Sequence, residues 1–192
     1  MRIAIIAWGS LIWDPRELPL DGNWHEHGPQ LPLEFSRVSS DDRLTLVIDY
    51  DHGATVETFY ATSPRTNLSD AITDLRAREG TVEKRIGFID AVHHRISADA
   101  YPDHRRASVP IRSWLDATAF DAAIWTALPS NFESKTGRPF TVENAIAYLE
   151  ALPLSVRAQA LNYVANAPCE VVTPLRRKLV ELGWIEEPGK RG

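Results

Sequence analysis

A glycine-serine turn and one glutamate are the residues of this sequence whose types and spacing point most directly to chemistry. The stretch IIAWGSLIWDP, residues 5–15, begins as a β-branched strand and breaks off at Gly9. Where a strand stops, consecutive backbone N–H groups lose their ladder partners and can converge on an anion, and glycine leaves room for a close approach. We therefore expect the amides of Gly9, Ser10 and Leu11 to bind a carboxylate. The flanking indoles, Trp8 and Trp13, would give this site apolar walls. The alternative is an ordinary tight turn with both tryptophans in the core.

The glutamate is Glu79, near the end of a predicted helix that Ser69 caps and Gly80 closes. Its apolar stripe reads Leu68, Ile72, Leu75, Glu79, so a carboxylate stands where the next core residue should be. Four other residues lie on the remaining surface of this helix and give it a solvent side: Thr73, Asp74, Ala77 and Arg78.

Two effects raise the pKa of a carboxylate in this position, because burial and the negative end of the helix dipole both disfavour its charge. A carboxylate of this kind makes a general base. The alternative is that Glu79 bends back to solvent or pairs with a nearby arginine, for which the sequence offers Arg76, Arg78 and Arg85.

Other reactive residue types form weaker patterns. His25 and His27 share one side of an extended segment but have no third ligand at a recognised spacing, so we expect no metal site. Cys169 is expected to be a buried structural thiol. Asp14 and Glu34 are further carboxylates for the site, although Glu34 is better explained as a structural partner of Arg37 or Arg43. The Gly-Ser pair lacks the second glycine of a nucleophile elbow, which argues against a Ser-His-Asp hydrolase.

These residues must be positioned by a β-rich first part and a helical second part. Alternating and apolar runs predict strands over 2–8, 31–38, 44–49, 55–62 and 85–96. Turns at 40–42 and 49–53 would join the middle strands into a meander. Helices are expected over 114–128, 142–151, 155–166 and 174–182, the last of which starts at Thr173-Pro174 and stops before Gly183.

Composition limits the partners. The 192 residues contain 21 basic and 26 acidic side chains, and a net charge of −5 disfavours a general nucleic-acid binder. One basic cluster, interrupted by Asp99 and Asp103, is expected to be a solvated surface loop: Arg95, Arg105, Arg106, Arg112, His93, His94 and His104. No stretch approaches the ~20 apolar residues of a membrane span. A single cysteine fits a reducing compartment, so we expect a cytoplasmic protein with no membrane partner.

Three blocks of this sequence resemble motifs that occur together in one protein family. They are AWGSLIWDP at 7–15, GATVETFY at 53–60 and LRAREG at 75–80, and they follow one another as a first strand with its turn, a later strand, and a helix ending in an acidic residue and glycine. In order and spacing they resemble the gamma-glutamylcyclotransferase-like superfamily, including its glutathione-degrading branch. The resemblance covers roughly residues 1–96.

The resemblance implies a small mixed β-barrel with flanking helices around a cavity for a γ-glutamyl group. In that family the turn amides, here those of Gly9, Ser10 and Leu11, hold the α-carboxylate of the substrate. The acidic residue, here Glu79, takes a proton from the α-amino group, whose nitrogen attacks its own γ-carbonyl and releases 5-oxoproline and an amine. The family needs no metal or organic cofactor.

The sequence departs from the family at Trp8, where the family usually has tyrosine. An indole only donates a hydrogen bond, whereas a phenol also accepts one. Any role of that hydroxyl in orienting substrate is therefore lost or moved, and Tyr60 and Tyr101 are the candidates to supply it.

For the whole chain we expect an α+β protein with a barrel over 1–110 and a helical extension over 111–192 packed on the same core. The extension has two apolar faces, Val142, Ala145, Ile146 and Leu149 on one and Leu175, Leu179 and Leu182 on the other. Short amphipathic helices need a surface to cover, which is either the barrel or a second subunit of a homodimer.

With the resemblance taken together with the residues, two functions of different classes remain open. The first is a gamma-glutamylcyclotransferase or a related γ-glutamyl amine lyase, favoured by Glu79 on an apolar stripe. The second is a noncatalytic small-molecule-binding or interaction protein with the same fold and cavity, favoured by Trp8.

Overall fold

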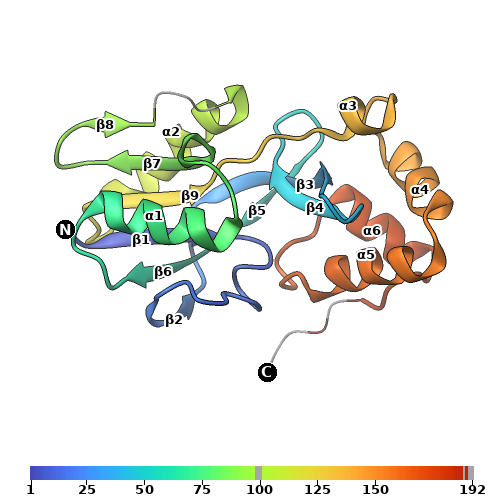
Figure 1. Ribbon diagram of the computed structural model, residues 1–192, viewed down its shortest axis with the longest axis horizontal. Coiled ribbons are helices and arrows are strands. Elements are labelled where there is room, and N and C mark those ends of the chain that lie inside the picture. The colour runs from blue at the N-terminus through green and yellow to red at the C-terminus, as the bar shows by residue number, and fades with distance from the viewer. Residues whose placement is uncertain (98–100, 188, 190–192) are drawn as a thin grey trace. The chain divides into compact units, whose positions relative to one another are not determined.

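The chain divides into two compact units, each built from two separate segments. A computed structural model describes residues 1–97, 101–187 and 189. The first unit contains Met1–Leu31 and Glu57–Leu128, and the second contains Pro32–Val56 and Pro129–Gly192. Both units combine strands with helices, which confirms the expected α+β class (Figure 1).

A six-stranded mixed sheet forms the centre of the first unit, in the order β2-β6-β1-β9-β7-β8. Its strands are β1 (Ile3–Ala7), β2 (Asp21–His25), β6 (Phe59–Ser63), β7 (Ile86–Asp90), β8 (Arg95–Ile96) and β9 (Ala122–Thr126). β1 and β9 are parallel, and β1 with β6 and β7 with β9 are antiparallel. β2 and β8 are the two ends of the sheet, so no closed barrel is found among the described residues.

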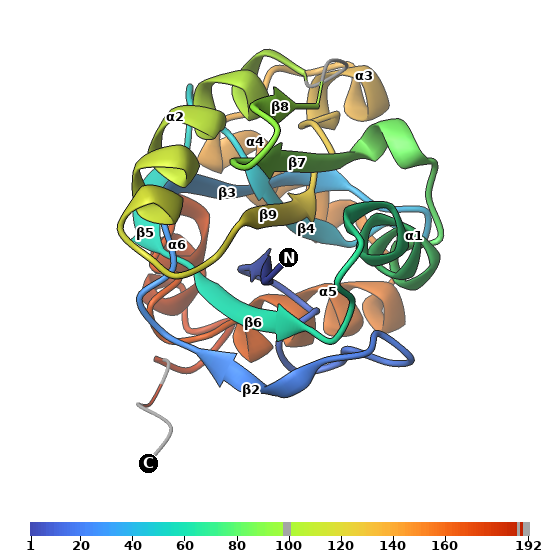
Figure 2. The same ribbon diagram turned by 90° about the vertical axis from the view of Figure 1, so that its left-hand side faces the viewer.

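Two helices cover opposite faces of this sheet, as Figure 2 shows: α1 (Leu68–Glu79) and α2 (Pro102–Asp116). Ile3 and Ile5 of β1 and Ile124 of β9 form one buried cluster with Leu75 of α1. Trp125, which follows Ile124 and so points to the other face, donates a hydrogen bond from its indole to His104 of α2. The side-chain alternation of β9 therefore separates an α1 face from an α2 face.

The ends of α1 follow local signals. Asn67 is the N-cap, and its side chain accepts a hydrogen bond from the amide of Ser69, so the expected cap at Ser69 is two residues too late. Gly80 closes the helix in the left-handed conformation with φ of 58°, as expected from its type. The short 3-10 helix η1 (Glu83–Arg85) then leads into β7.

The second unit has a three-stranded sheet in the order β4-β3-β5, formed by β3 (Gln30–Val38), β4 (Leu44–Ile48) and β5 (Ala54–Glu57). The chain crosses between the units within β3 and β5. Its helices are α3 (Phe132–Thr136), α4 (Val142–Ala151), α5 (Leu154–Asn166) and α6 (Pro174–Glu181). α4 packs against α5 and α6, and α5 lies against β4. Thr173 caps α6 through its hydroxyl, as its position before Pro174 predicts.

Four expectations about the elements are wrong. Residues 55–62 are not one strand, because β5 belongs to the three-stranded sheet and β6 to the six-stranded sheet. Residues 114–128 are not one helix, because α2 ends at Asp116 and the apolar run AAIWT forms β9 between β1 and β7. Residues 85–96 are a hairpin of β7 and β8 instead of one strand. The meander is absent as well, since β3 lies between β4 and β5, and the turn at 49–53 joins strands that are not neighbours.

Within the described ranges, no helix is both long and apolar enough to cross a membrane.

Candidate functional site

The predicted turn and the predicted base lie in the same unit and are joined by Arg78. The Arg78 guanidinium donates from Nη1 to Oε1 of Glu79 at 2.9 Å and from Nη2 to Oγ of Ser10 at 3.2 Å. Nη2 also donates to the backbone carbonyl of Asp14 at 2.5 Å. The last turn of α1 is thereby fastened to the loop that follows β1.

Arg78 is buried, although its position in the sequence placed it on the solvent side of the helix. Only 5% of its side chain is exposed, against 14% for Glu79. The reason is the loop of residues 8–18, which covers this end of α1 and supplies acceptors for the guanidinium. Periodicity within a helix carries no information about such a loop.

Glu79 combines burial with an ion pair, so both interpretations of this residue contribute. Burial raises the pKa of the carboxyl, while the charge and hydrogen bond of Arg78 and the charge of Arg16 oppose this increase. The net result is a raised pKa, as a general base requires.

The turn itself is tight and has unused donors. The amide of Ile12 donates to the carbonyl of Gly9 at 3.0 Å, and that of Asp14 to the carbonyl of Ser10 at 2.8 Å. By contrast, the amides of Gly9, Ser10 and Leu11 have no hydrogen-bond acceptor among the described residues. Gly9 and Leu11 are buried and Ser10 is half-buried.

The aromatic residues expected at the site lie in different parts of the first unit. Trp8 is buried and Trp13 half-buried, and both belong to the loop region after β1. Tyr60 is paired with Ile6 across β1 and β6, and its ring contacts Trp114 of α2 and Phe120. It therefore lies on the α2 face of the sheet, opposite the helix that carries Glu79.

Tyr101 does not supply the hydroxyl that Trp8 lacks either. This residue precedes α2, and its ring contacts that of His104, which binds Trp125 on the α2 face. Neither tyrosine that the sequence offered as a source of the missing hydroxyl lies on the α1 face with Glu79.

Glu34 belongs to the second unit and is not a second carboxylate of this site. It is fully buried and accepts hydrogen bonds from the amides of Phe35 at 2.7 Å and Leu175 at 3.1 Å, instead of pairing with an arginine. Asp14 stays in the first unit, where its carboxylate is exposed and pairs with Arg16.

The remaining residues of interest are dispersed. His25 stacks on Tyr60 and His27 pairs with Glu57, so the two imidazoles have different surroundings. In residues 1–97, 101–187 and 189, no group of three or more His, Cys, Asp or Glu side chains is arranged to hold a metal ion. His104 is buried and not on a surface loop, and its desolvation lowers its pKa to about 4. Asp99 lies outside the described residues.

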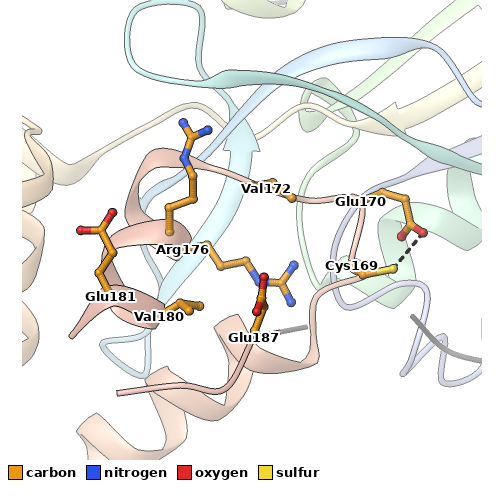
Figure 3. Close-up of a pocket in the computed structure, with 8 residues that line it drawn as sticks. Cys169, Glu170, Val172, Arg176, Val180, Glu181 and Glu187 are labelled. Carbon is orange, nitrogen blue, oxygen red and sulfur yellow. Dashed lines mark hydrogen bonds between the residues drawn. The ribbon is translucent and has the colours of Figure 1, made fainter. Parts of the chain in front are cut away.

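A cavity of about 520 Å³ lies in the second unit, around α6 and the segment before it. Figure 3 shows the side chain of Arg176 extending from α6 toward Cys169, with Glu187 beside it. The guanidinium is already bound to the carbonyls of four residues, and Cys169 is half-buried with its thiol donating to Glu170 at 3.0 Å. The residues that line this cavity were not among those singled out in the sequence, apart from Cys169, which was expected to be buried.

Comparison of the chain with models of protein families, with curated proteins and with solved structures finds no match in any of the three.

Proposed function

We propose that this chain is an enzyme of the gamma-glutamylcyclotransferase type, which cyclises a γ-glutamyl group to 5-oxoproline and releases an amine. The observation that carries the proposal is the shared guanidinium: Arg78 binds both Glu79 and Ser10, so the base lies beside the turn that would hold the substrate. The two features were selected separately in the sequence, one from a strand end and one from a helix stripe.

The donors and acceptors at this position match the head group of a γ-glutamyl compound. Free amides of Gly9, Ser10 and Leu11 suit an α-carboxylate, and the carboxylate of Glu79 suits the adjacent α-ammonium. Both charges sit on one carbon of the ligand, so binding them together fixes its orientation.

In the proposed reaction Glu79 accepts a proton from the α-ammonium, and the freed nitrogen attacks the γ-carbonyl carbon. The bond between that carbon and the leaving nitrogen then breaks, and the protons lost by the attacking nitrogen end on the departing amine. Holding the chain in a folded, near-attack geometry supplies most of the acceleration, because ring closure is intramolecular. This sequence of steps uses no metal and no organic cofactor.

A noncatalytic small-molecule-binding protein with the same site is the second candidate, and one observation favours it. The carboxylate of Glu79 is held by Arg78, and an ion-paired carboxylate is a weaker base than a free one. Trp8 in place of the family tyrosine, with Tyr60 and Tyr101 on the other face of the sheet, points in the same direction.

The finer points of the proposal follow from the same resemblance. We assign the six-stranded sheet of the first unit, with α1 and α2, to the barrel type of the gamma-glutamylcyclotransferase-like superfamily. We place the protein in the cytoplasm because its single cysteine fits a reducing compartment. A homodimer is the proposed assembly, and nucleic acid and membranes are not proposed partners.

Incubation with a panel of γ-glutamyl compounds, followed by detection of 5-oxoproline by mass spectrometry, tests the proposal. The panel contains γ-glutamyl amino acids, γ-glutamyl amines and glutathione, with α-glutamyl isomers as matched controls that cannot form the same ring. Release of 5-oxoproline from at least one γ-isomer and from no α-isomer supports the enzyme. Binding of the γ-isomers without release supports the noncatalytic candidate, and neither binding nor release rejects both.

A further inference from the structure

The guanidinium of Arg78 has a hydrogen-bond donor that none of its partners uses. Its two Nη atoms serve Glu79, Ser10 and the carbonyl of Asp14, while its Nε is buried and has no partner among the described residues. A buried donor without a partner is unfavourable, so this one calls for an explanation.

The neighbourhood of Arg78 is rich in donors and poor in anions. Among the described residues, the amides of Gly9, Ser10 and Leu11 lack acceptors, and Glu79 is the one carboxylate bound to this guanidinium. Asp14 offers only its backbone carbonyl here, because its carboxylate pairs with Arg16. The site therefore has donors without an acceptor, and a ligand carboxylate would supply one.

We propose that Arg78 is a positioning residue that changes partners when substrate binds, passing from the carboxylate of Glu79 to the α-carboxylate of the substrate. This inference rests on the proposed function. With substrate bound, the guanidinium and the turn amides hold the α-carboxylate together, and Glu79 is released to face the α-ammonium.

This exchange of partners explains how Glu79 can be paired with Arg78 in the free protein and still act as a base. In the free protein two cations act on Glu79, Arg78 in direct contact and Arg16 at longer range, and both lower its basicity. Releasing Arg78 restores that basicity only after a carboxylate has arrived.

Binding measurements test this without requiring turnover. L-glutamate has the required head group but no leaving amine, and its α-carboxamide lacks only the carboxylate charge. The affinities of both are measured by calorimetry for the natural protein, for Arg78→Met and for Arg76→Met, a control on the same helix whose side chain makes no hydrogen bond to the turn among the described residues. We expect the natural protein and Arg76→Met to prefer L-glutamate by about 10- to 100-fold, and Arg78→Met to lose most of this preference.

The outcomes separate the two proposals. If the natural protein does not prefer L-glutamate, the proposed function itself fails. If it does and Arg78→Met keeps the full preference, the proposed function stands and the exchange is rejected. If Arg78→Met weakens both ligands equally, its role is structural and the exchange is again rejected. Should Arg78→Met not fold, Arg78→Lys retains the cation but not the planar fork, and a preference reduced at least threefold is required.

For an active preparation, pH profiles give a second readout. The pH profile of kcat/KM reports the pKa values of the free enzyme, and the profile of kcat reports those of the complex with substrate. Because Arg78 leaves Glu79 only in the complex, Arg78→Met should move the acid limb of kcat/KM to higher pH and leave that of kcat in place. A parallel movement of both limbs would mean that Arg78 stays on Glu79 throughout.

Discussion

The buried carboxylate of Glu34 accepts a hydrogen bond from the amide of Leu175, 3.1 Å away and 141 positions later in the chain. Leu175 lies in the first turn of α6, whose free amides and positive dipole end favour a negative charge. Burial has the larger effect and raises the pKa of Glu34 to about 7, against the hydrogen bonds from Thr173, Phe35 and Leu175, with Asp49 adding to the increase. The second unit thus contains a buried carboxyl group, bound to the first turn of α6, whose pKa is raised to about 7.

The raised pKa of Glu34 predicts that the stability of the second unit depends on pH. The folded state holds the Glu34 proton more tightly than the unfolded chain, so its contribution is complete below the ordinary pKa of 4.5 and is lost as the pH rises to about 7. The difference corresponds to roughly 3 kcal/mol. Chemical denaturation between pH 4.5 and 8 should show this loss in the natural protein and in Glu133→Gln, a control at an exposed glutamate, but not in Glu34→Gln. Equal slopes in all three proteins would contradict the assignment.

Glu79→Gln should abolish turnover and spare binding. The amide keeps the shape of the side chain but cannot accept the α-ammonium proton, so the rate of 5-oxoproline release should fall by about two to four orders of magnitude. L-glutamate should bind with comparable affinity. A variant that retains more than a tenth of the natural rate would remove Glu79 from the role of base.

Gly9→Val should have the opposite effect on the site. The branched side chain would occupy space that the carboxylate needs at the turn, so affinity for L-glutamate should drop while the thermal midpoint of the protein is monitored as a control. Unchanged affinity in a folded variant would place the carboxylate elsewhere.

Arg176→Met should destabilise the second unit strongly. The guanidinium donates to the carbonyls of Ala165 at 3.2 Å, Ala167 at 2.6 Å and Val171 at 2.9 Å, and also to that of Pro168. The first two lie at the carboxyl end of α5, where a cation is favourable. Methionine fills similar space but leaves these carbonyls unpaired, and the free energy of unfolding should fall by about 3 kcal/mol.

The neighbouring arginine supplies the control for that experiment. Arg177 is exposed, so Arg177→Met should change the free energy of unfolding by less than about 0.5 kcal/mol. Similar losses in both variants, measured by urea denaturation, would show that the carbonyl contacts of Arg176 contribute little.

The parts of the fold that could be predicted depend on local signals. Gly80 closes α1 because only glycine adopts its left-handed conformation without strain, and the Thr173-Pro174 pair starts α6 because a cap and a fixed φ act within one turn. The strand β9 was misassigned because a short apolar run has the same pattern in a buried helix and in a buried strand, and only pairing with β1 decides between them.

The candidate site shows the same division. Glu79 could be selected from its position on an apolar stripe, and the turn from the break after a strand. Arg78 was one of three arginines offered as a partner of Glu79, but its contacts with the turn could not be predicted, since Ser10 and Asp14 lie 68 and 64 positions away and no periodicity links them. Tyr60 was misplaced because the sequence gives no indication of which face of the sheet a given strand residue takes.

The division of each unit into two segments has a consequence for synthesis on the ribosome. When residues 32–56 leave the exit tunnel, the segment 129–192 that completes their unit has not yet been made. The first unit can assemble once residue 128 has emerged. At that point α5, which packs against β4, and α6, whose Leu175 amide binds Glu34, are still missing. We expect nascent chains halted between these points to expose apolar strand residues, a state in which incomplete proteins are prone to aggregate.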